Sequence, residues 1–374
     1  MTIQNSRTRH AYLLIHFVVF FGITVPVSAD DWPQFRGAQR LGIWNETGIV
    51  NTLPKELNVK WRTPLGSGYS GPAVADGRIF VSDWSEDPES RTLDGVERAI
   101  ALDEQTGEIL WTHEWETTYR MLIVSYAVGP RATPTVDDDR VYVLGATGKL
   151  FCFDVETGAV RWQKDFIEDY DTSVPVYGIA SAPLVDGNRL ITLVGGEPDA
   201  LVVAFDKYTG DEIWRALPVL SELGYAHPVI YEAGGVRQLI IWHPEALVSL
   251  DPESGEVYWE QPWEVSMAVS LATPVKSGDY LLVSQFFNGS MMMRLSRDRP
   301  SATMMSIPFP YNSIRSASIS ESGVINTTFP VNIVRSFPST KIVSTLSAVK
   351  EKRSLSPNIG ELISINPSKI NANK

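Results

Sequence analysis

The chain has 374 residues, of which 44% are apolar, so it is long enough to bury a sizeable core. Its net charge is −12 at pH 7, and residues 30–305 hold no cluster of Lys and Arg. This argues against nucleic-acid binding, because phosphate contacts need clustered basic side chains. The only cysteine is Cys152, which excludes an intramolecular disulfide.

Residues 1–29 have the composition of a secretory signal peptide. Arg7 and Arg9 give a basic start, an apolar run covers 11–25, and Val27-Ser28-Ala29 supplies the small residues of a cleavage site. The run is about 15 residues long, whereas a membrane span needs about 20. We therefore predict cleavage after Ala29 rather than an uncleaved membrane anchor. No cysteine follows the run, so we expect no lipid anchor and a periplasmic or secreted protein without a transmembrane span.

One unit repeats between residues 61 and 305. Each copy has an Asp, a Gly four residues later and a Trp eight residues after the Asp, with Thr or Ser before the Gly. The four copies are Asp103, Gly107 and Trp111; Asp154, Gly158 and Trp162; Asp206, Gly210 and Trp214; and Asp251, Gly255 and Trp259. A Pro-led apolar segment, a turn and an aliphatic segment precede each copy. A fixed spacing of this kind indicates a repeat architecture.

Each unit is predicted to form four short strands. The first begins at the Pro, a turn leads into the second, and the third ends at the Asp, whose side chain can accept backbone N–H groups in the next turn. The Gly supplies the positive φ of that turn, and the Trp on the fourth strand suits packing between sheets. One such sheet cannot bury both faces, so we predict an all-β fold, a β-propeller of four-stranded blades. A linear β-solenoid is the alternative.

The unit resembles the repeat of pyrroloquinoline quinone (PQQ) enzymes and of BamB-like exported proteins, which share the propeller without the cofactor. Residues 31–37, Asp31-Trp32-Pro33-Gln34-Phe35-Arg36-Gly37, are similar to the N-terminal signature of exported PQQ-like repeat proteins. The resemblance covers about residues 31–305. It implies a family with eight blades, in which Trp61 lies on a strand that completes the last blade. It is specific for the fold and not for an activity.

The repeat pattern weakens after the fourth copy. A fifth unit begins at Pro274, but Met304-Met305-Ser306 stands where its Trp belongs, so we predict four complete blades and one partial blade. Residues 306–374 contain no Trp, Asp, Cys or His. We divide the chain into a signal peptide (1–29), an N-terminal arm (30–60), an incomplete propeller (61–305) and a Ser-rich basic tail (306–374). The tail is either the product of a shifted reading frame or a diverged, disordered extension.

No catalytic constellation is recognisable, so an enzyme is not the favoured interpretation. A quinoprotein dehydrogenase needs oxygen ligands for Ca²⁺, and alcohol-oxidising members of that class carry adjacent cysteines, which a chain with Cys152 alone does not have. The histidines have no zinc-like spacing. We expect no metal site and no cofactor, and PQQ with Ca²⁺ is the alternative. Cys152, within an apolar segment, is expected to be an inert core thiol.

The leading hypothesis is a protein-binding or scaffolding module whose partners are other periplasmic or envelope proteins. A second alternative is binding of a small ligand or carbohydrate in the axial channel, lined by side chains just before each Pro. The candidates there are Tyr69, Arg131, Tyr225 and His227, and Arg131 is the natural contact for a carboxylate. The acidic segment 83–90 is expected to form an exposed loop whose Trp84 contacts a partner or is simply solvated.

Overall fold

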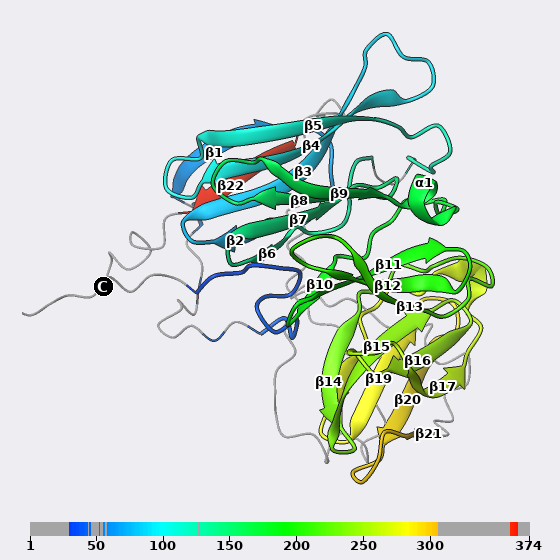
Figure 1. Ribbon diagram of the computed structural model, residues 1–374. Coiled ribbons are helices and arrows are strands. Elements are labelled where there is room, and N and C mark those ends of the chain that lie inside the picture. The colour runs from blue at the N-terminus through cyan, green and yellow to red at the C-terminus, as the bar shows by residue number, and fades with distance from the viewer. Residues whose placement is uncertain are drawn as a thin grey trace, which may run out of the picture. The chain divides into compact units, whose positions relative to one another are not determined.

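The computed structural model describes residues 30–305, except 44, 46–51, 53–54, 57 and 126–127, together with the backbone of 360–365. Within this part, the chain forms five antiparallel sheets of four strands each and one sheet of two strands (Figure 1). We number the four-stranded sheets 1 to 5 in chain order. The predicted all-β propeller of four-stranded blades is confirmed.

The strands of each sheet follow one another directly along the chain. Sheet 1 contains β2 (Ala73–Ala75), β3 (Arg78–Glu86), β4 (Asp94–Asp103) and β5 (Ile109–Thr118). Sheet 2 contains β6 (Thr135–Asp137), β7 (Arg140–Leu144), β8 (Lys149–Asp154) and β9 (Val160–Asp165). Sheet 3 contains β10 (Leu184–Asp186), β11 (Arg189–Gly196), β12 (Ala200–Asp206) and β13 (Glu212–Ala216). Sheet 4 contains β14 (Val229–Ala233), β15 (Val236–His243), β16 (Ala246–Leu250) and β17 (Val257–Pro262). Sheet 5 contains β18 (Val275–Ser277), β19 (Tyr280–Gln285), β20 (Gly289–Leu295) and β21 (Ala302–Met305).

The Asp and Gly of the repeat form the turn between the third and fourth strands, as predicted. Asp103 Oδ1 accepts hydrogen bonds from the backbone N–H groups of Gln105 and Thr106 at 2.9 and 2.8 Å. These bonds favour the charged carboxylate and lower the pKa of Asp103. The Gly adopts a positive φ in all four copies, at Gly107, Gly158, Gly210 and Gly255. The side chains of the motif Asp residues therefore cap these turns.

The Trp of each of the first three repeats joins its sheet to the next one. The indole of Trp111 covers Gly158, where a Cβ would overlap the ring, and its Nε1–H donates to the carbonyl of Val155 at 3.0 Å. Trp162 donates in the same way to Lys207, at 3.1 Å, and Trp214 to Pro252, at 3.3 Å. In every case the acceptor is the residue that follows the motif Asp. The repeat therefore encodes the contact between sheets as well as the sheets themselves.

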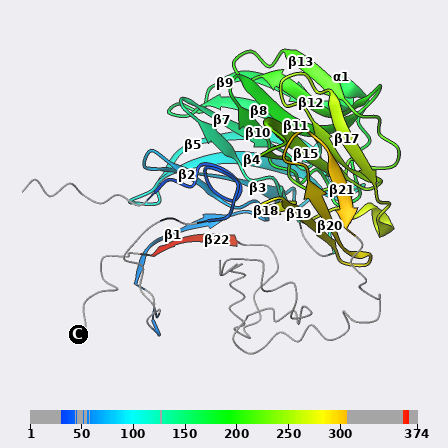
Figure 2. The ribbon, with the colours of Figure 1, turned by 90° about the horizontal axis from the view of Figure 1, so that it is seen from below.

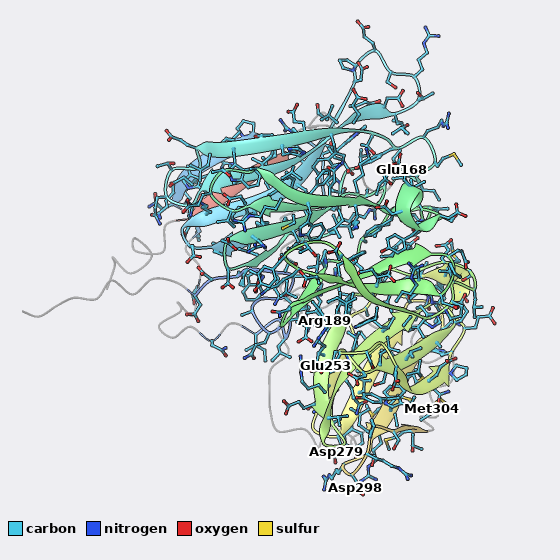
Figure 3. The ribbon with its side chains drawn as sticks, in the orientation of Figure 1. Glu168, Arg189, Glu253, Asp279, Asp298 and Met304 are labelled. Atoms are coloured by element: carbon cyan, nitrogen blue, oxygen red, sulfur yellow. The ribbon has the colours of Figure 1, made fainter. Side chains whose placement is uncertain are left out.

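An ion pair also links sheets 3 and 4. Arg189, at the start of β11, lies beside Glu253, in the turn between β16 and β17, with 3.6 Å between the charged atoms (Figure 3). Arg189 also reaches Asp186 at the end of β10, at 3.6 Å. Glu253 is largely exposed, so solvent screens this pair and it contributes little free energy.

Sheet 5 corrects the expectation of a partial fifth blade. It has all four strands, although in the strand register Arg294 stands where the other repeats have Asp and Met305 where they have Trp. Trp259 does not donate to a backbone carbonyl of the next sheet as the other three do. Its Nε1–H donates instead to the side chain of Gln238 in its own sheet. The alternation of apolar and polar residues is therefore sufficient to form the sheet without the Asp-Gly turn of the other repeats.

One row of side chains on sheet 5 stays partly exposed. It crosses the sheet in register, from Val275 to Leu282, Met292 and Met305, and both end residues are 38% exposed. The matching row of sheet 1 is buried and belongs to a core cluster shared with sheet 2; it consists of Ala73, Phe80, Ala101 and Trp111. The far face of sheet 5 therefore has the apolar character of a face that packs against a further sheet.

The remaining sheet joins distant parts of the chain. β1 (Val59–Leu65) pairs antiparallel with β22 (Gly360–Ile365), and the two strands lie side by side in both ribbon views (Figure 2). Trp61, on β1, covers Gly107 and donates from Nε1 to the carbonyl of Glu104 at 3.0 Å. Other residues of the predicted signal peptide and tail lie outside the described part of the chain, and the proposed domain boundaries stay a prediction.

Candidate functional site

The four candidate channel residues lie in the connections between sheets. Because neighbouring strands within a sheet are antiparallel, these connections lie at the same end as the turns between second and third strands. We call this the connector end. Tyr69 lies between β1 and β2, Arg131 between β5 and β6, and Tyr225 and His227 between β13 and β14. The connections also contain α1 (Phe166–Tyr170) and the 3₁₀ turn η1 (Ser266–Ala268).

Two of the candidates are brought together through a third side chain. The Arg131 guanidinium lies 5.9 Å from the ring centre of Tyr177, and Tyr177 packs edge-on against Tyr225, also at 5.9 Å. Tyr225 is buried and donates to Glu222 at 3.3 Å. Burial raises the pKa of the Tyr225 hydroxyl, so it stays protonated. Tyr69 is 61% exposed. Whether this group binds a ligand stays a prediction.

His227 lies against the N-terminal arm. Its ring stacks on Phe35 with 3.6 Å between ring centres, and its Nδ1 accepts a hydrogen bond from the backbone N–H of Ala182 at 2.9 Å. Burial, with the charges of Arg40 and Arg36 nearby, lowers the pKa of His227 to about 3. The imidazole is therefore neutral at physiological pH, with Nδ1 as an acceptor.

Arg40 is the most deeply buried cation of the arm, 3% exposed, and the sequence analysis did not single it out. Its guanidinium donates to the carbonyls of Ala182, Pro183 and Pro228, and its Nε–H donates to the side chain of Gln34. Burial lowers the pKa of Arg40 to about 9. The charge is stabilised by carbonyl dipoles at the starts of sheets 3 and 4.

The arm thus contacts the first strand, or the residues just before it, in four sheets. Trp32 exchanges two backbone hydrogen bonds with Val74 of β2, and Pro33 accepts one from Val136 of β6. Arg40 then reaches the residues just before β10 and β14. The signature beginning at Asp31 marks this segment in the sequence, but the role of Arg40, outside that signature, is visible only in the structure.

A buried carboxyl group joins sheets 1 and 2 near the connector end. Glu97, fully buried on β4, accepts hydrogen bonds from the Nε1–H of Trp115, the hydroxyl of Tyr119 and the backbone N–H of Ala146, at 2.8, 2.5 and 2.9 Å. Burial raises the pKa of Glu97, and these three donors oppose that rise. With both carboxylate oxygens accepting hydrogen bonds from protein donors, Glu97 has the environment of a structural link rather than of a catalytic base.

Segment 83–90 is exposed over residues 85–89, as the sequence suggested, but its first residues are buried in a strand. Residues up to Glu86 belong to β3, and Trp84 is only 3% exposed. Its ring stacks on Tyr119 with 4.7 Å between ring centres. Asp83 is buried as well and forms a bidentate ion pair with Arg98. The expectation of a partner contact through Trp84 was wrong, because a long hairpin continues β3 and β4 past the point where the other sheets turn.

Large apolar side chains are exposed in the connection between β1 and β2 and in each of the four connections between consecutive sheets from sheet 1 to sheet 5. The set consists of Tyr69, Met121, Ile123, Ile167, Val176, Leu220, Met267 and Leu271, each between 39% and 77% exposed. Phe286, 86% exposed, follows β19 at the same end. Exposed apolar side chains also occur near the start of the fourth strands, at Ile109, Ile213 and Val257. That second set falls at two adjacent repeat positions, six residues after the motif Asp for Ile109 and Val257 and seven for Ile213, so the repeat accounts for it.

A family model described as outer membrane protein assembly factor BamB matches residues 95–306, which is more than half of the chain. The chain belongs to this family of PQQ-like repeat proteins. It is 24% identical to the BamB protein of Yersinia pestis over 255 residues, 64% of this chain and 55% of the relative. It is also 30% identical to a quinohemoprotein alcohol dehydrogenase of Pseudomonas putida over 193 residues, 49% of this chain and 26% of the relative. The chain therefore spans about a quarter to a half of the length of these relatives.

Among solved structures, a europium-containing methanol dehydrogenase superposes with a TM-score of 0.52 and 14% identity, covering 74% of this chain and 58% of that one. At this identity the similarity concerns the fold alone. BamB-family and dehydrogenase relatives share the propeller, so membership in the family leaves open which activity this chain has.

A PQQ site would need a group of ligands that holds its Ca²⁺ ion. In residues 30–305, as far as they are described, no three His, Cys, Asp or Glu side chains gather so that they can hold a metal ion. Cys152 is fully buried on β8, and burial raises its pKa to about 12, which makes the thiol unreactive. We therefore derive no chemical step through a quinone. The described part also contains no helix long and apolar enough to cross a membrane.

Proposed function

We propose that the chain is an exported scaffold that binds another envelope protein through the exposed apolar side chains at its connector end. The observation that carries this proposal is that every connection between consecutive sheets presents at least one such side chain, among them Met121, Leu220 and Met267. Exposed apolar side chains gathered on one surface are typical of protein-binding sites. Relatives named as outer membrane protein assembly factors support a partner of that kind.

The location in the periplasm is part of the proposal. A cleaved signal peptide over residues 1–29 would export the chain, and the mature protein would begin at Asp30. BamB relatives from Yersinia pestis and Burkholderia pseudomallei are assembly factors of the outer membrane by name, which agrees with an exported protein.

Site-specific photo-crosslinking in native cells tests the scaffold. A photoreactive phenylalanine analogue replaces Leu220, Met267 or Leu271 at the connector end, and Ile213 or Val257 serves as a matched control with 45% or 49% exposure. We expect one and the same envelope protein to be crosslinked from the connector end and not from the controls. Equal crosslinking from both sets, or none from the connector end, contradicts the proposal.

A quinoprotein dehydrogenase is the second candidate, favoured by the 30% identity to the Pseudomonas putida enzyme. Titration of the purified, folded protein with PQQ and Ca²⁺ distinguishes it from the scaffold. Saturable binding would favour the dehydrogenase and direct the work to alcohol oxidation. The axial-ligand alternative is tested with Arg131→Ala, which should abolish binding of a carboxylate ligand while the fold is retained.

A further inference from the structure

We propose that a cavity between sheets 4 and 5 binds a phosphate group, either free or carried by a larger molecule. The cavity lies at the turn end, which is the end of the sheets opposite the connector end. Its volume is about 230 Å³. Pockets for drug-sized ligands measure about 300–1,000 Å³, so this cavity suits a small group. The proposal does not depend on the scaffold function, which concerns the other end of the sheets.

Three turns of the chain line the cavity. Residues 232–234 at the end of β14 form the wall on sheet 4. On sheet 5, Lys276 and residues 278–279 come from the turn between β18 and β19, and residues 295–297 come from the turn between β20 and β21. Figure 3 labels Asp279 and Asp298, one in each of these two turns of sheet 5. The ion pair of Arg297 with Asp279 shows that the two turns are adjacent.

At the two preceding joints, charged side chains bridge the sheets at this end. Lys207 of sheet 3 donates to Asp137 of sheet 2 at 2.5 Å, and Arg237 of sheet 4 forms an ion pair with Asp186 of sheet 3. Sheet 5 has Leu295 at the position of Lys207, because each follows the residue that is opposite the first residue of the second strand. Since leucine cannot form such a bridge, the joint between sheets 4 and 5 lacks its ion pair within the described residues.

The cavity holds a cation without a counter-ion. Lys276 is half-buried in the cavity wall, and its ammonium forms no ion pair with any residue that the structure describes. Arg297 is held at the wall by Asp279, whose Oδ2 accepts from Nε at 2.7 Å and from Nη2 at 2.6 Å. The hydrogen bond from Arg297 lowers the pKa of Asp279, and the charges of Arg294 and Lys276 act in the same direction. Three cations therefore surround one carboxylate.

The other acidic side chain in the wall is balanced elsewhere. Glu232 is exposed and is opposite Arg237 in the pair of β14 with β15, and its charge stabilises the charged form of Arg237. The cavity therefore keeps a positive charge that a bound anion would neutralise.

The turn of sheet 5 also differs in charge from those of the other sheets. The five residues after Arg294 include Arg297, Asp298 and Arg299 and carry a net positive charge, whereas the five residues after each motif Asp are neutral or negative in sum. In a chain of net charge −12, this end of sheet 5 is thus a local site of attraction for anions. A phosphate monoester carries about −1.5 to −2 charges near pH 7 and offers several acceptor oxygens, so it can bind Lys276 and Arg297 at once.

Calorimetric titration of the purified full chain with inorganic phosphate tests the site. Lys276→Gln should weaken binding by about tenfold or more, because it removes a charge-assisted hydrogen bond. The matched control is Arg299→Gln, which removes a charge from the same end of sheet 5 but outside the cavity wall, and it should bind as the parent does. Absence of saturable binding to the parent, or equal binding by Lys276→Gln and the parent, overturns the proposal.

A second variant covers the case in which Lys276→Gln fails to fold. Glu232→Gln removes the exposed carboxylate from the wall and should bind phosphate at least as tightly as the parent. Weaker binding by Glu232→Gln overturns the positive character of the site.

Vesicles distinguish the two sources of the phosphate group. Binding to vesicles of phosphatidic acid but not of phosphatidylcholine, lost in Lys276→Gln, assigns a lipid headgroup. Binding of inorganic phosphate without binding to either vesicle assigns a free phosphate. Lys276→Gln should leave the photo-crosslinks from the connector end unchanged, so failure of this site and failure of the scaffold proposal are distinguishable.

Discussion

The indole N–H of Trp61 donates to the backbone carbonyl of Glu104 across 3.0 Å, although 43 residues separate them in the chain. The same bond recurs between Trp111 and Val155 and again between Trp162 and Lys207, over 44 and 45 residues. β1 and each of the first three repeats are therefore joined to the next sheet by one indole, which makes these tryptophans the points at which stability is most easily tested.

Trp111→Ala should lower the free energy of unfolding by about 3–5 kcal/mol, because it removes a buried ring between sheets 1 and 2. Trp111→Phe keeps much of the ring but leaves the carbonyl of Val155 without its donor, and should cost about 1–3 kcal/mol. Denaturant unfolding measures both. The control is Trp259→Phe, since Trp259 donates within its own sheet. A loss at Trp111 no larger than that at Trp259 would contradict the docking role.

Arg40→Met should lower the free energy of unfolding by about 2–4 kcal/mol, because the carbonyls of Ala182, Pro183 and Pro228 lose a charged donor. The matched control is Arg36→Met, since Arg36 donates only to Leu41 within the arm among the hydrogen bonds of the described residues, and it should cost below about 1 kcal/mol. Thermal or denaturant unfolding measures both variants. Equal losses would show that the buried guanidinium does not hold the arm in place.

His227 should make the protein less stable as the pH falls. Its pKa is about 3 in the fold against an ordinary value of 6.5, so the unfolded chain binds the proton more tightly. The stabilising effect is complete above pH 6.5 and is lost progressively toward pH 3, by at most about 1.4 kcal/mol per pH unit. Protonation also removes the Nδ1 acceptor of the Ala182 N–H.

The difference between the parent and His227→Asn isolates this effect from the carboxylates, which titrate lower. Between pH 6.5 and pH 5, the parent should lose more stability than the variant in chemical denaturation. Parallel curves over that range would mean that the His227 ring is accessible to protons in the folded state.

The mature protein should begin at Asp30. Intact-mass analysis of protein from the periplasmic fraction of native cells should give the mass of residues 30–374. A mass that includes residues 1–29 in a membrane fraction would favour the uncleaved anchor. Peptides from residues 306–374 in the same sample would rule out a shifted reading frame for the tail.

The fold could be predicted from the sequence because the residues of the repeat act locally. Asp103, Gly107 and Trp111 recur at fixed spacing, and each acts within one turn or between two adjacent sheets. The fourth strand of sheet 5 escaped notice because Met305 fills the place of Trp without its shape or its N–H group. The sequence analysis wrongly placed Trp84 in an exposed loop, because the acidic residues around it gave no sign that β3 continues to Glu86.

Less of the candidate site could be predicted from the sequence. The position before each Pro predicted Arg131 and Tyr225 as channel residues, and that role stays a prediction. It gave no sign of Tyr177, which lies between them, or of Phe35, which stacks on His227. Contacts of that kind depend on which connection lies over which strand. No periodicity encodes them, so only the three-dimensional arrangement shows them.

The contacts of Arg40 constrain the order in which the protein can assemble. The arm leaves the ribosome before every sheet, yet two of its acceptors, Ala182 and Pro228, lie 142 and 188 residues later in the chain. Sheets 1 to 3 can form as they are synthesised, since their strands are sequential, whereas the arm must wait for the start of sheet 4. Final docking of the arm is then a late folding step, one that reports that four sheets have reached their native positions.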